Sequence, residues 1–150
     1  MGLIKQIKAS LVLPELAATS KKEVLHELAE AVQSQYSNLD TQTVFNILQE
    51  REALGSTGIG DGIAIPHGKV KNLREITICF GRSRKGLPFD ALDGKPTHLF
   101  FLLLAPEDAA APYLSCLAEL SRFLKNPEVR ERLLHAETRQ ELLNVFTEAG

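Results

Sequence analysis

Leu99-Phe-Phe-Leu-Leu-Leu104 is apolar at every position. A strand with one face in water alternates apolar and polar residues, whereas an unbroken apolar run is typical of a central strand that is covered on both faces. Pro106 is expected to end this strand. The run therefore predicts a sheet with helices packed on both of its sides.

The segments around this run supply the other elements. Ile76-Thr-Ile-Cys-Phe80 alternates like a strand with one buried face. Between it and the central strand, turns are expected at Gly86, Pro88 and Asp93-Gly94. A capping box opens at Ser20, and the apolar residues after it repeat at helical spacing, which predicts a helix over residues 21–35.

Four more helices are expected. Asp40 can cap a second helix that ends before Gly55. The starts of the other three are expected at Ala109, Asn126 and Thr138. Helices at both ends of the chain, with strands between them in no regular β–α alternation, predict an α/β protein. The expected architecture is a three-layer αβα sandwich with a mixed central β-sheet, formed by a single domain over residues 1–150.

Composition excludes several functional classes. Seventeen basic and nineteen acidic residues give a net charge of −2, which argues against a nucleic-acid partner held by general phosphate neutralisation. The two cysteines show no C-x-x-C spacing, which favours reduced structural thiols. The first residues lack the apolar core of a signal peptide, and the run 99–105 is too short to cross a bilayer. The sequence thus predicts a cytoplasmic protein without direct membrane insertion.

Five of the ten glycines lie in the fourteen residues Gly55-Ser-Thr-Gly-Ile-Gly-Asp-Gly-Ile-Ala-Ile-Pro-His-Gly68. His67 follows a short apolar strand, 63–65, and a proline that restricts the backbone. Gly68 is expected to turn the chain and leave the imidazole at the tip of that strand, where α/β proteins commonly place sites.

The residues around His67 suggest a site for an anion. Backbone N–H groups of Gly58, Gly60 and Gly62 can point into a concavity that suits an anion. Ser56 and Thr57 add hydroxyl donors. Positive charge can come from Arg51 and Lys69. A neutral imidazole has one free ring nitrogen near pH 7, so this combination suggests phosphoryl chemistry on His67.

Other interpretations remain open at this point. His67 can be a plain loop residue, and the glycines can form a structural loop or bind a nucleotide phosphate. The stretch is neither a P-loop nor a G-x-G-x-x-G turn before a helix. The other histidines, at positions 26, 98 and 135, are weaker candidates. No pair of histidines has metal-ligand spacing, so no metal site is expected. No cofactor is predicted.

The stretch from Arg51 to Gly68 resembles the active-site signature of the IIA proteins of the bacterial phosphoenolpyruvate-dependent phosphotransferase system. The resemblance is to the fructose/mannitol type, which includes the nitrogen-regulatory IIA proteins. Glu52 fits the signature's acidic or amide position, Ile59-Gly60 fits its apolar–small pair, and the run that ends in Pro-His-Gly is complete.

The resemblance implies an αβα sandwich in which His67 accepts a phosphoryl group from phospho-HPr, or from a nitrogen-type HPr. It gives Arg51 the role of stabilising the phosphate. In sugar-transporting members of the family the phosphoryl group passes to a IIB domain. Regulatory members instead signal their phosphorylation state to other proteins. The residues expected to touch the phosphate besides these are Ser56, Thr57, Gly58, Gly60 and Tyr113.

Tyr113 marks a departure from the family, because many members have a second active-site histidine at the matching position. A phenol can donate one hydrogen bond to a phosphoryl oxygen but carries no positive charge near neutral pH. The run Gly-Ser-Thr-Gly-Ile-Gly-x-Gly is most like the nitrogen-regulatory branch, so a regulatory protein is the favoured prediction. The alternatives are a sugar-transport relay and a sensor that binds a phosphate ligand without a covalent step.

Overall fold

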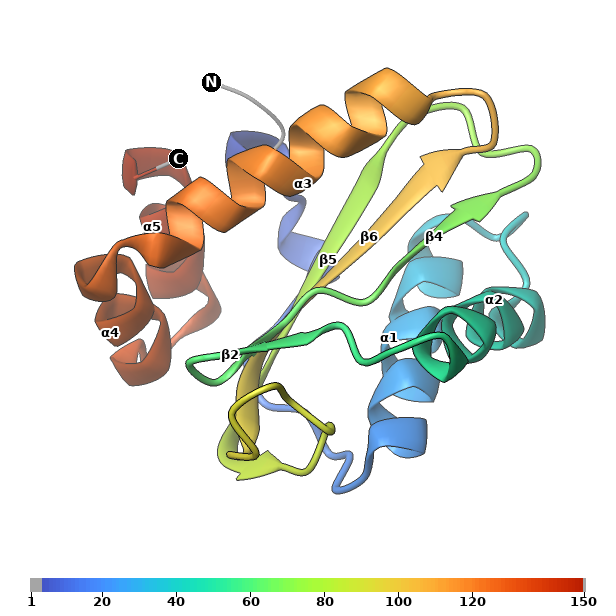
Figure 1. Ribbon diagram of the computed structural model, residues 1–150. Coiled ribbons are helices and arrows are strands. Elements are labelled where there is room, and N and C mark those ends of the chain that lie inside the picture. The colour runs from blue at the N-terminus through green and yellow to red at the C-terminus, as the bar shows by residue number, and fades with distance from the viewer. Residues whose placement is uncertain (1–3, 150) are drawn as a thin grey trace.

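A six-stranded mixed sheet forms the middle layer of the computed structural model, which describes residues 4–149 (Figure 1). The expectation about a signal peptide rests partly on residues 1–3, which lie outside this range. The strands are β1 (Val12–Leu13), β2 (Gly58–Gly60), β3 (Ile63–Ala64), β4 (His67–Val70), β5 (Thr77–Leu87) and β6 (Thr97–Pro106). Their order is β1-β5-β6-β3-β2, and β4 also pairs with β6.

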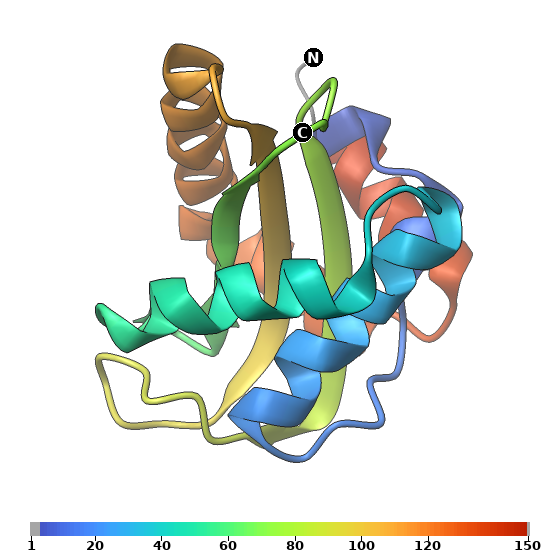
Figure 2. The ribbon, with the colours of Figure 1, turned by 90° about the vertical axis from the view of Figure 1, so that its right-hand side faces the viewer.

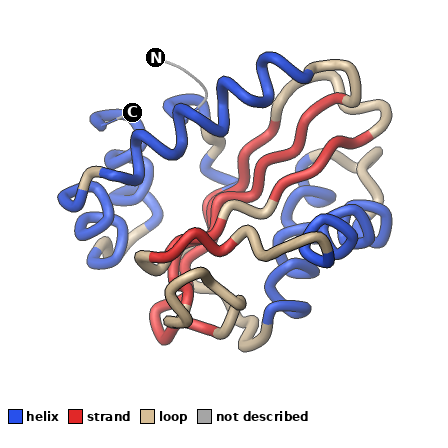
Figure 3. The backbone as a smooth tube through the Cα atoms, in the orientation of Figure 1, coloured by secondary structure: helices blue, strands red, loops and turns tan. Residues whose placement is uncertain are grey.

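Helices cover both faces of this sheet (Figures 1 and 2). On one face lie α1 (Lys21–Gln35) and α2 (Thr41–Ala53). The other face carries α3 (Ala110–Lys125), α4 (Pro127–His135) and α5 (Arg139–Ala149). Two short 3-10 turns, η1 (Ile4–Gln6) and η2 (Ala9–Leu11), precede β1. The three-layer αβα sandwich is confirmed, and Figure 3 shows the strands running between the two groups of helices.

The predicted helix starts are confirmed by their caps. The side chain of Ser20 accepts the backbone N–H of Glu23, and the side chain of Asp40 accepts that of Thr43. Asn126 does the same for the N–H of Glu128 at the start of α4. Each of these bonds satisfies a donor that the first turn of a helix otherwise leaves without a partner.

Strand β6 runs through the centre of the protein and explains the unbroken apolar run. Leu99, Phe101 and Leu103 belong to the core that packs on α3, α4 and α5. The alternate residues, Phe100, Leu102 and Leu104, belong to the core on the side of α1 and α2. Because successive side chains of a strand point to opposite faces, both faces of β6 must be apolar.

The prediction for the preceding strand is wrong in two respects. Strand β5 extends to Leu87 instead of ending near Phe80, and Thr77 and Cys79 are buried as fully as their neighbours. The reason is that β5 lies between β1 and β6 and is therefore covered on both faces. Gly86 belongs to β5 and not to a turn. Its φ of +78° accompanies a shift in the pairing register with β6, as in a β-bulge.

Arg82 is a charged residue whose burial no pattern in the sequence predicts. The guanidinium is fully buried on β5, where Nε donates to the carbonyl of Pro14 at 3.0 Å. Nη1 donates to the carbonyl of Leu133 at 2.8 Å, in the last turn of α4. Carbonyls at the end of a helix have no partner within the helix. Arg82 therefore attaches the end of α4 to the sheet.

Candidate active site

His67 is the first residue of β4 and lies beside Leu103 of β6. The segment before it, β3, pairs in parallel with the beginning of β6, and Ile65 and Pro66 interrupt the pairing between the two short strands. The prediction that His67 stands at the tip of a strand is therefore wrong. The imidazole lies instead along one edge of the sheet, at the point where a broken strand resumes.

Gly68 does not turn the chain, contrary to prediction. It continues β4 opposite Leu104. A Cβ atom at this position would lie 2.5 Å from Cγ2 of Ile47 on α2, well inside van der Waals contact. Glycine is thus required here because α2 packs closely against the strand.

The edge position of β4 lets helices from both faces of the sheet reach His67. Arg51 comes from the last turn of α2, and its Nε lies 3.2 Å from Nε2 of His67. Tyr113 comes from the first turns of α3, on the opposite face, and its ring centroid is 5.8 Å from that of the imidazole. The fold thus brings together three of the predicted site residues from three separate elements.

The hydrogen bonds of His67 determine which ring nitrogen is free to react. Nδ1 lies 2.7 Å from the carbonyl oxygen of Ile65. Because a carbonyl only accepts, we assign the ring proton to Nδ1. Nε2 then has an unshared electron pair and accepts the Nε–H of Arg51. The arrangement presents Nε2 as a nucleophile beside a permanent positive charge.

Burial lowers the pKa of His67 below its ordinary value of 6.5, and the Arg51 charge lowers it further. The hydrogen bond to the carbonyl of Ile65 and the charge of Glu52 raise the pKa and partly offset these effects. Loss of solvent around an imidazole disfavours its charged form. The neutral, nucleophilic form of His67 is therefore the major form at neutral pH.

A pH titration checks this assignment. We expect the midpoint for His67, followed by the NMR signals of its ring, to lie below 6.5. A proton on Nε2 removes the electron pair, so the reactivity of His67 is expected to be constant above that midpoint and to decline as the pH falls through it. A midpoint above 6.5 would contradict the assignment of a neutral ring beside Arg51.

Glu52, the next residue after Arg51, has a side chain that is only 5% exposed. Its carboxylate accepts the backbone N–H of Thr57 at 3.1 Å and also the hydroxyl of Thr57. Lys21, the first residue of α1, places its Nζ 2.9 Å from Oε1 of Glu52. Glu52 thus joins α2 to the loop that follows it. The family signature describes this position only as acidic or amide.

The predicted phosphate-binding loop is largely engaged by the protein's own acceptors and donors. The hydroxyl of Ser56 donates to the carbonyl of Phe89 at 2.8 Å and accepts the N–H of Gly58 at 3.0 Å. Gly60 packs beside the carboxylate of Asp93. Phosphate binding by Ser56, Thr57, Gly58 and Gly60 stays a prediction.

Tyr113 is almost fully buried, and burial raises the pKa of its phenol to about 12. It therefore stays neutral near pH 7 and keeps its proton as a hydrogen-bond donor. Lys69, two residues after His67 on β4, places its Nζ 5.8 Å from the centre of the Tyr113 ring. Residues i and i+2 of a strand share a face, which puts this cation on the same side as the imidazole.

The remaining histidines lie in other surroundings. His98 has Nδ1 3.0 Å from the carbonyl of Ser83, and His135 pairs with Glu131 on the exposed side of α4. His26 belongs to α1, packs edge-on against Phe45 and lies 3.5 Å from Glu30. Among residues 4–149, no group of three or more His, Cys, Asp or Glu side chains is placed to hold a metal ion.

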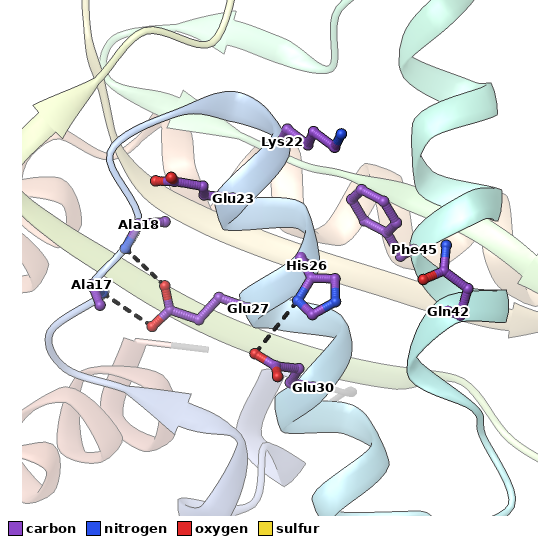
Figure 4. Close-up of a pocket in the computed structure, with 9 residues that line it drawn as sticks. All are labelled: Ala17, Ala18, Lys22, Glu23, His26, Glu27, Glu30, Gln42 and Phe45. Carbon is purple, nitrogen blue, oxygen red and sulfur yellow. Dashed lines mark hydrogen bonds and ion pairs between the residues drawn. The ribbon is translucent and has the colours of Figure 1, made fainter.

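A hollow of about 820 Å³ lies on the surface between α1 and α2 and is lined in part by His26 and Phe45 (Figure 4). Both carboxylate oxygens of Glu27 accept backbone N–H groups there, from Ala17 at 3.0 Å and Ala18 at 2.9 Å. Glu27 thus holds the segment before α1 in place, and the hydrogen bonds and the ring contact of His67 involve none of the residues that line the hollow.

Comparison with known proteins identifies the family. Residues 5–149 match the family described as "Phosphoenolpyruvate-dependent sugar phosphotransferase system, EIIA 2". The chain belongs to this family. The resemblance read from the sequence is thereby confirmed, and the protein is an EIIA component of a phosphotransferase system. No helix within the described residues is both long and apolar enough to cross a membrane.

Similar proteins of this family carry two kinds of name. A "Nitrogen regulatory protein" of Bradyrhizobium diazoefficiens is 37% identical over 97% of this chain and 95% of its own length. A "PTS system fructose-specific EIIA component" of Haloferax volcanii is 41% identical over 73% of this chain and 71% of its own. The crystal structure of nitrogen regulatory protein IIA-Ntr from Neisseria meningitidis superposes with a TM-score of 0.90 at 36% identity, covering 97% of this chain and all of that one.

Proposed function

We propose that this EIIA protein accepts a phosphoryl group on Nε2 of His67 from a phosphorylated carrier protein of the HPr type. The observation that carries the proposal is the position of Nε2, 3.2 Å from Nε of Arg51, in a ring whose Nδ1 lies 2.7 Å from the carbonyl oxygen of Ile65. These two contacts assign the ring proton to Nδ1 and leave Nε2 unprotonated. A nucleophile and a group that stabilises negative charge thus lie side by side.

The transfer step follows from this arrangement. The Nε–H of Arg51 leaves Nε2 and donates to an oxygen of the incoming phosphoryl group. The freed electron pair of Nε2 attacks the phosphorus of the donor's phosphohistidine, and the donor's P–N bond breaks with its electron pair returning to the donor nitrogen. The proton on Nδ1 stays in place against the carbonyl of Ile65. The phosphoryl group carries about −1.5 to −2 charges. Arg51 offsets part of this charge, in a reaction that depends mainly on positioning and electrostatics.

Exposed apolar side chains favour a protein as the donor over a small phosphate ligand. Leu54 is 86% exposed and follows Arg51 by three residues, and Leu114 is 64% exposed and follows Tyr113 directly. Arg51 and Tyr113 both contact His67. Exposed apolar side chains beside a site are typical of a protein-docking surface.

We infer that the protein is a regulator whose partners distinguish free from phosphorylated His67. Support comes from the nitrogen regulatory relatives, which match along nearly all of this chain. Tyr113 supports the same inference, because a neutral phenol beside His67 supplies no positive charge for transfer of the phosphoryl group to a IIB domain. The second candidate, a relay to a IIB domain in sugar uptake, is favoured by the fructose-specific relative. A cytoplasmic location fits either role.

The test is phosphorylation in a reconstituted system. The protein is incubated with phosphoenolpyruvate, Enzyme I and HPr, and its intact mass is measured before and after mild acid. We expect one acid-labile phosphate per chain, because a phosphohistidine is unstable in acid. An unlabelled protein alongside labelled HPr would overturn the proposal. Addition of a IIB protein then separates the two roles, since a relay loses its phosphate to IIB and a regulator retains it.

A further inference from the structure

Glu52 is a buried carboxylate that does not touch His67 but lies next to Arg51 on α2. A buried carboxylate is costly unless it is paired and hydrogen-bonded. Glu52 has both kinds of partner: Thr57 supplies hydrogen bonds, and Lys21 supplies a charge at 2.9 Å. Within residues 4–149, Lys21 is the cation that lies at salt-bridge distance from this carboxylate.

Lys21 joins three segments that are far apart in the sequence. Its backbone opens α1, and its ammonium reaches Glu52 near the end of α2. The same ammonium lies 3.4 Å from the carboxylate of Asp90 and 4.9 Å from the centre of the Phe89 ring, in the loop between β5 and β6. The carbonyl of Phe89 in turn accepts the hydroxyl of Ser56. One side chain thus ties α1 and this loop to the glycine-rich segment.

That segment also determines the orientation of Arg51. Nη1 of Arg51 donates to the carbonyl of Gly55 at 2.8 Å, while Nε points at His67. The guanidinium is planar and rigid, so the carbonyl of Gly55 fixes the direction of the Nε–H bond. The backbone N–H of Gly55 donates to the backbone carbonyl of Glu52 at 3.1 Å. Two residues further on, Thr57 bonds to the side chain of Glu52, so both ends of the 55–57 turn are attached to Glu52.

We propose that Lys21 is a positioning residue for phosphoryl transfer at His67. By pairing with Glu52 it fixes the 55–57 turn, and through that turn it aims the guanidinium of Arg51 at Nε2. Lys21 lies thirty residues before Arg51 in the sequence and outside the signature motif. This inference rests on the proposed function of His67 for its kinetic consequence, but its geometric content holds without it.

The experiment compares Lys21→Met with Lys21→Arg and with Lys22→Met. Lys22 is exposed and follows Lys21 on α1. Lys22→Met removes the same charge as Lys21→Met and is therefore the matched control. NMR of the unphosphorylated protein follows the Nε–H signal of Arg51 and the ¹⁵N shift of His67 Nε2. Single-turnover transfer from phospho-HPr gives the rate and the half-saturating donor concentration.

We expect Lys21→Met to weaken the Arg51 Nε–H signal, shift the Nε2 resonance and slow transfer by about ten- to a hundred-fold, as small misplacements of catalytic groups do. The half-saturating donor concentration should change less than about two-fold, because the proposal gives Lys21 a role in orienting Arg51 and none in docking the donor. Lys21→Arg should restore most of the rate. Lys22→Met should match wild type in every measurement.

Two results would overturn the inference. One is a Lys21→Met protein with wild-type NMR signals and a wild-type rate, and the other is an equal loss in Lys22→Met. A wild-type protein that takes no phosphate refutes the proposed function instead, while the NMR signals still test the role of Lys21. If Lys21→Met fails to fold, Glu52→Gln breaks the same pair without leaving a buried charge and is expected to give the same spectral change.

Discussion

Replacement of His67 by glutamine is expected to abolish phosphorylation by phosphoenolpyruvate, Enzyme I and HPr. Glutamine can still accept the Nε–H of Arg51 through its amide oxygen, which preserves much of the local hydrogen bonding. Its amide nitrogen has no free electron pair to attack phosphorus. The measurement is intact mass after incubation, and the expected result is no added phosphate under conditions that fully label wild type.

His98→Gln is the matched control, because His98 is also partly buried and also places Nδ1 against a backbone carbonyl. It should be labelled like wild type. A His67→Gln protein that still takes an acid-labile phosphate would show that another side chain is the acceptor. If neither protein is labelled, and both bind inorganic phosphate saturably, the non-covalent sensor becomes the better explanation.

Arg51→Gln is expected to slow transfer to His67 by about a hundred- to a thousand-fold, the usual effect of removing a group aimed at charge that develops in the transition state. The guanidinium performs two tasks at once, since Nη1 binds the carbonyl of Gly55 and Nε faces His67. Lysine has a single ammonium and cannot form this fork. Arg51→Lys should therefore recover little of the rate in single-turnover transfer from phospho-HPr.

Arg132→Gln provides the comparison for a remote arginine. Arg132 is exposed on α4 and pairs with Glu148 at 2.9 Å, away from His67. Its loss should leave the transfer rate unchanged, because exposed pairs contribute little and α4 does not reach the site. Equal rates for Arg51→Gln and wild type would remove Arg51 from the mechanism and leave its contact with His67 without a catalytic role.

Local patterns predict much of this fold correctly. The apolar run of β6 indicates a strand covered on both faces, and the capping residues Ser20, Asp40 and Asn126 mark the starts of three helices. The signature from Arg51 to Gly68 indicates the family. Each of these signals lies within a short stretch of chain, because hydrogen bonds of caps and the periodicity of strands and helices are local.

Errors arise where a pattern has two structural explanations. Gly68 is predicted to form a turn, but glycine is needed there because a Cβ atom would clash with the side chain of Ile47. The alternation of residue types in β5 predicts one buried face, yet Thr77 and Cys79 are buried on the other face. Nothing in the local sequence around Arg82 predicts its burial, which depends on carbonyls at the end of α4. In each case the partner is distant in the sequence.

The sequence by itself determined the family, the central strand, the succession of helices and the identity of His67 as the candidate acceptor. Only the tertiary structure decided that His67 lies at the edge of the sheet, where Arg51 and Tyr113 arrive from opposite faces. It also decided that Lys21 pairs with Glu52, the residue next to Arg51 on α2. The physical reason is that these contacts join residues from 16 to 46 positions apart, and the spacing of residue types along a chain carries no record of which distant segments pack together.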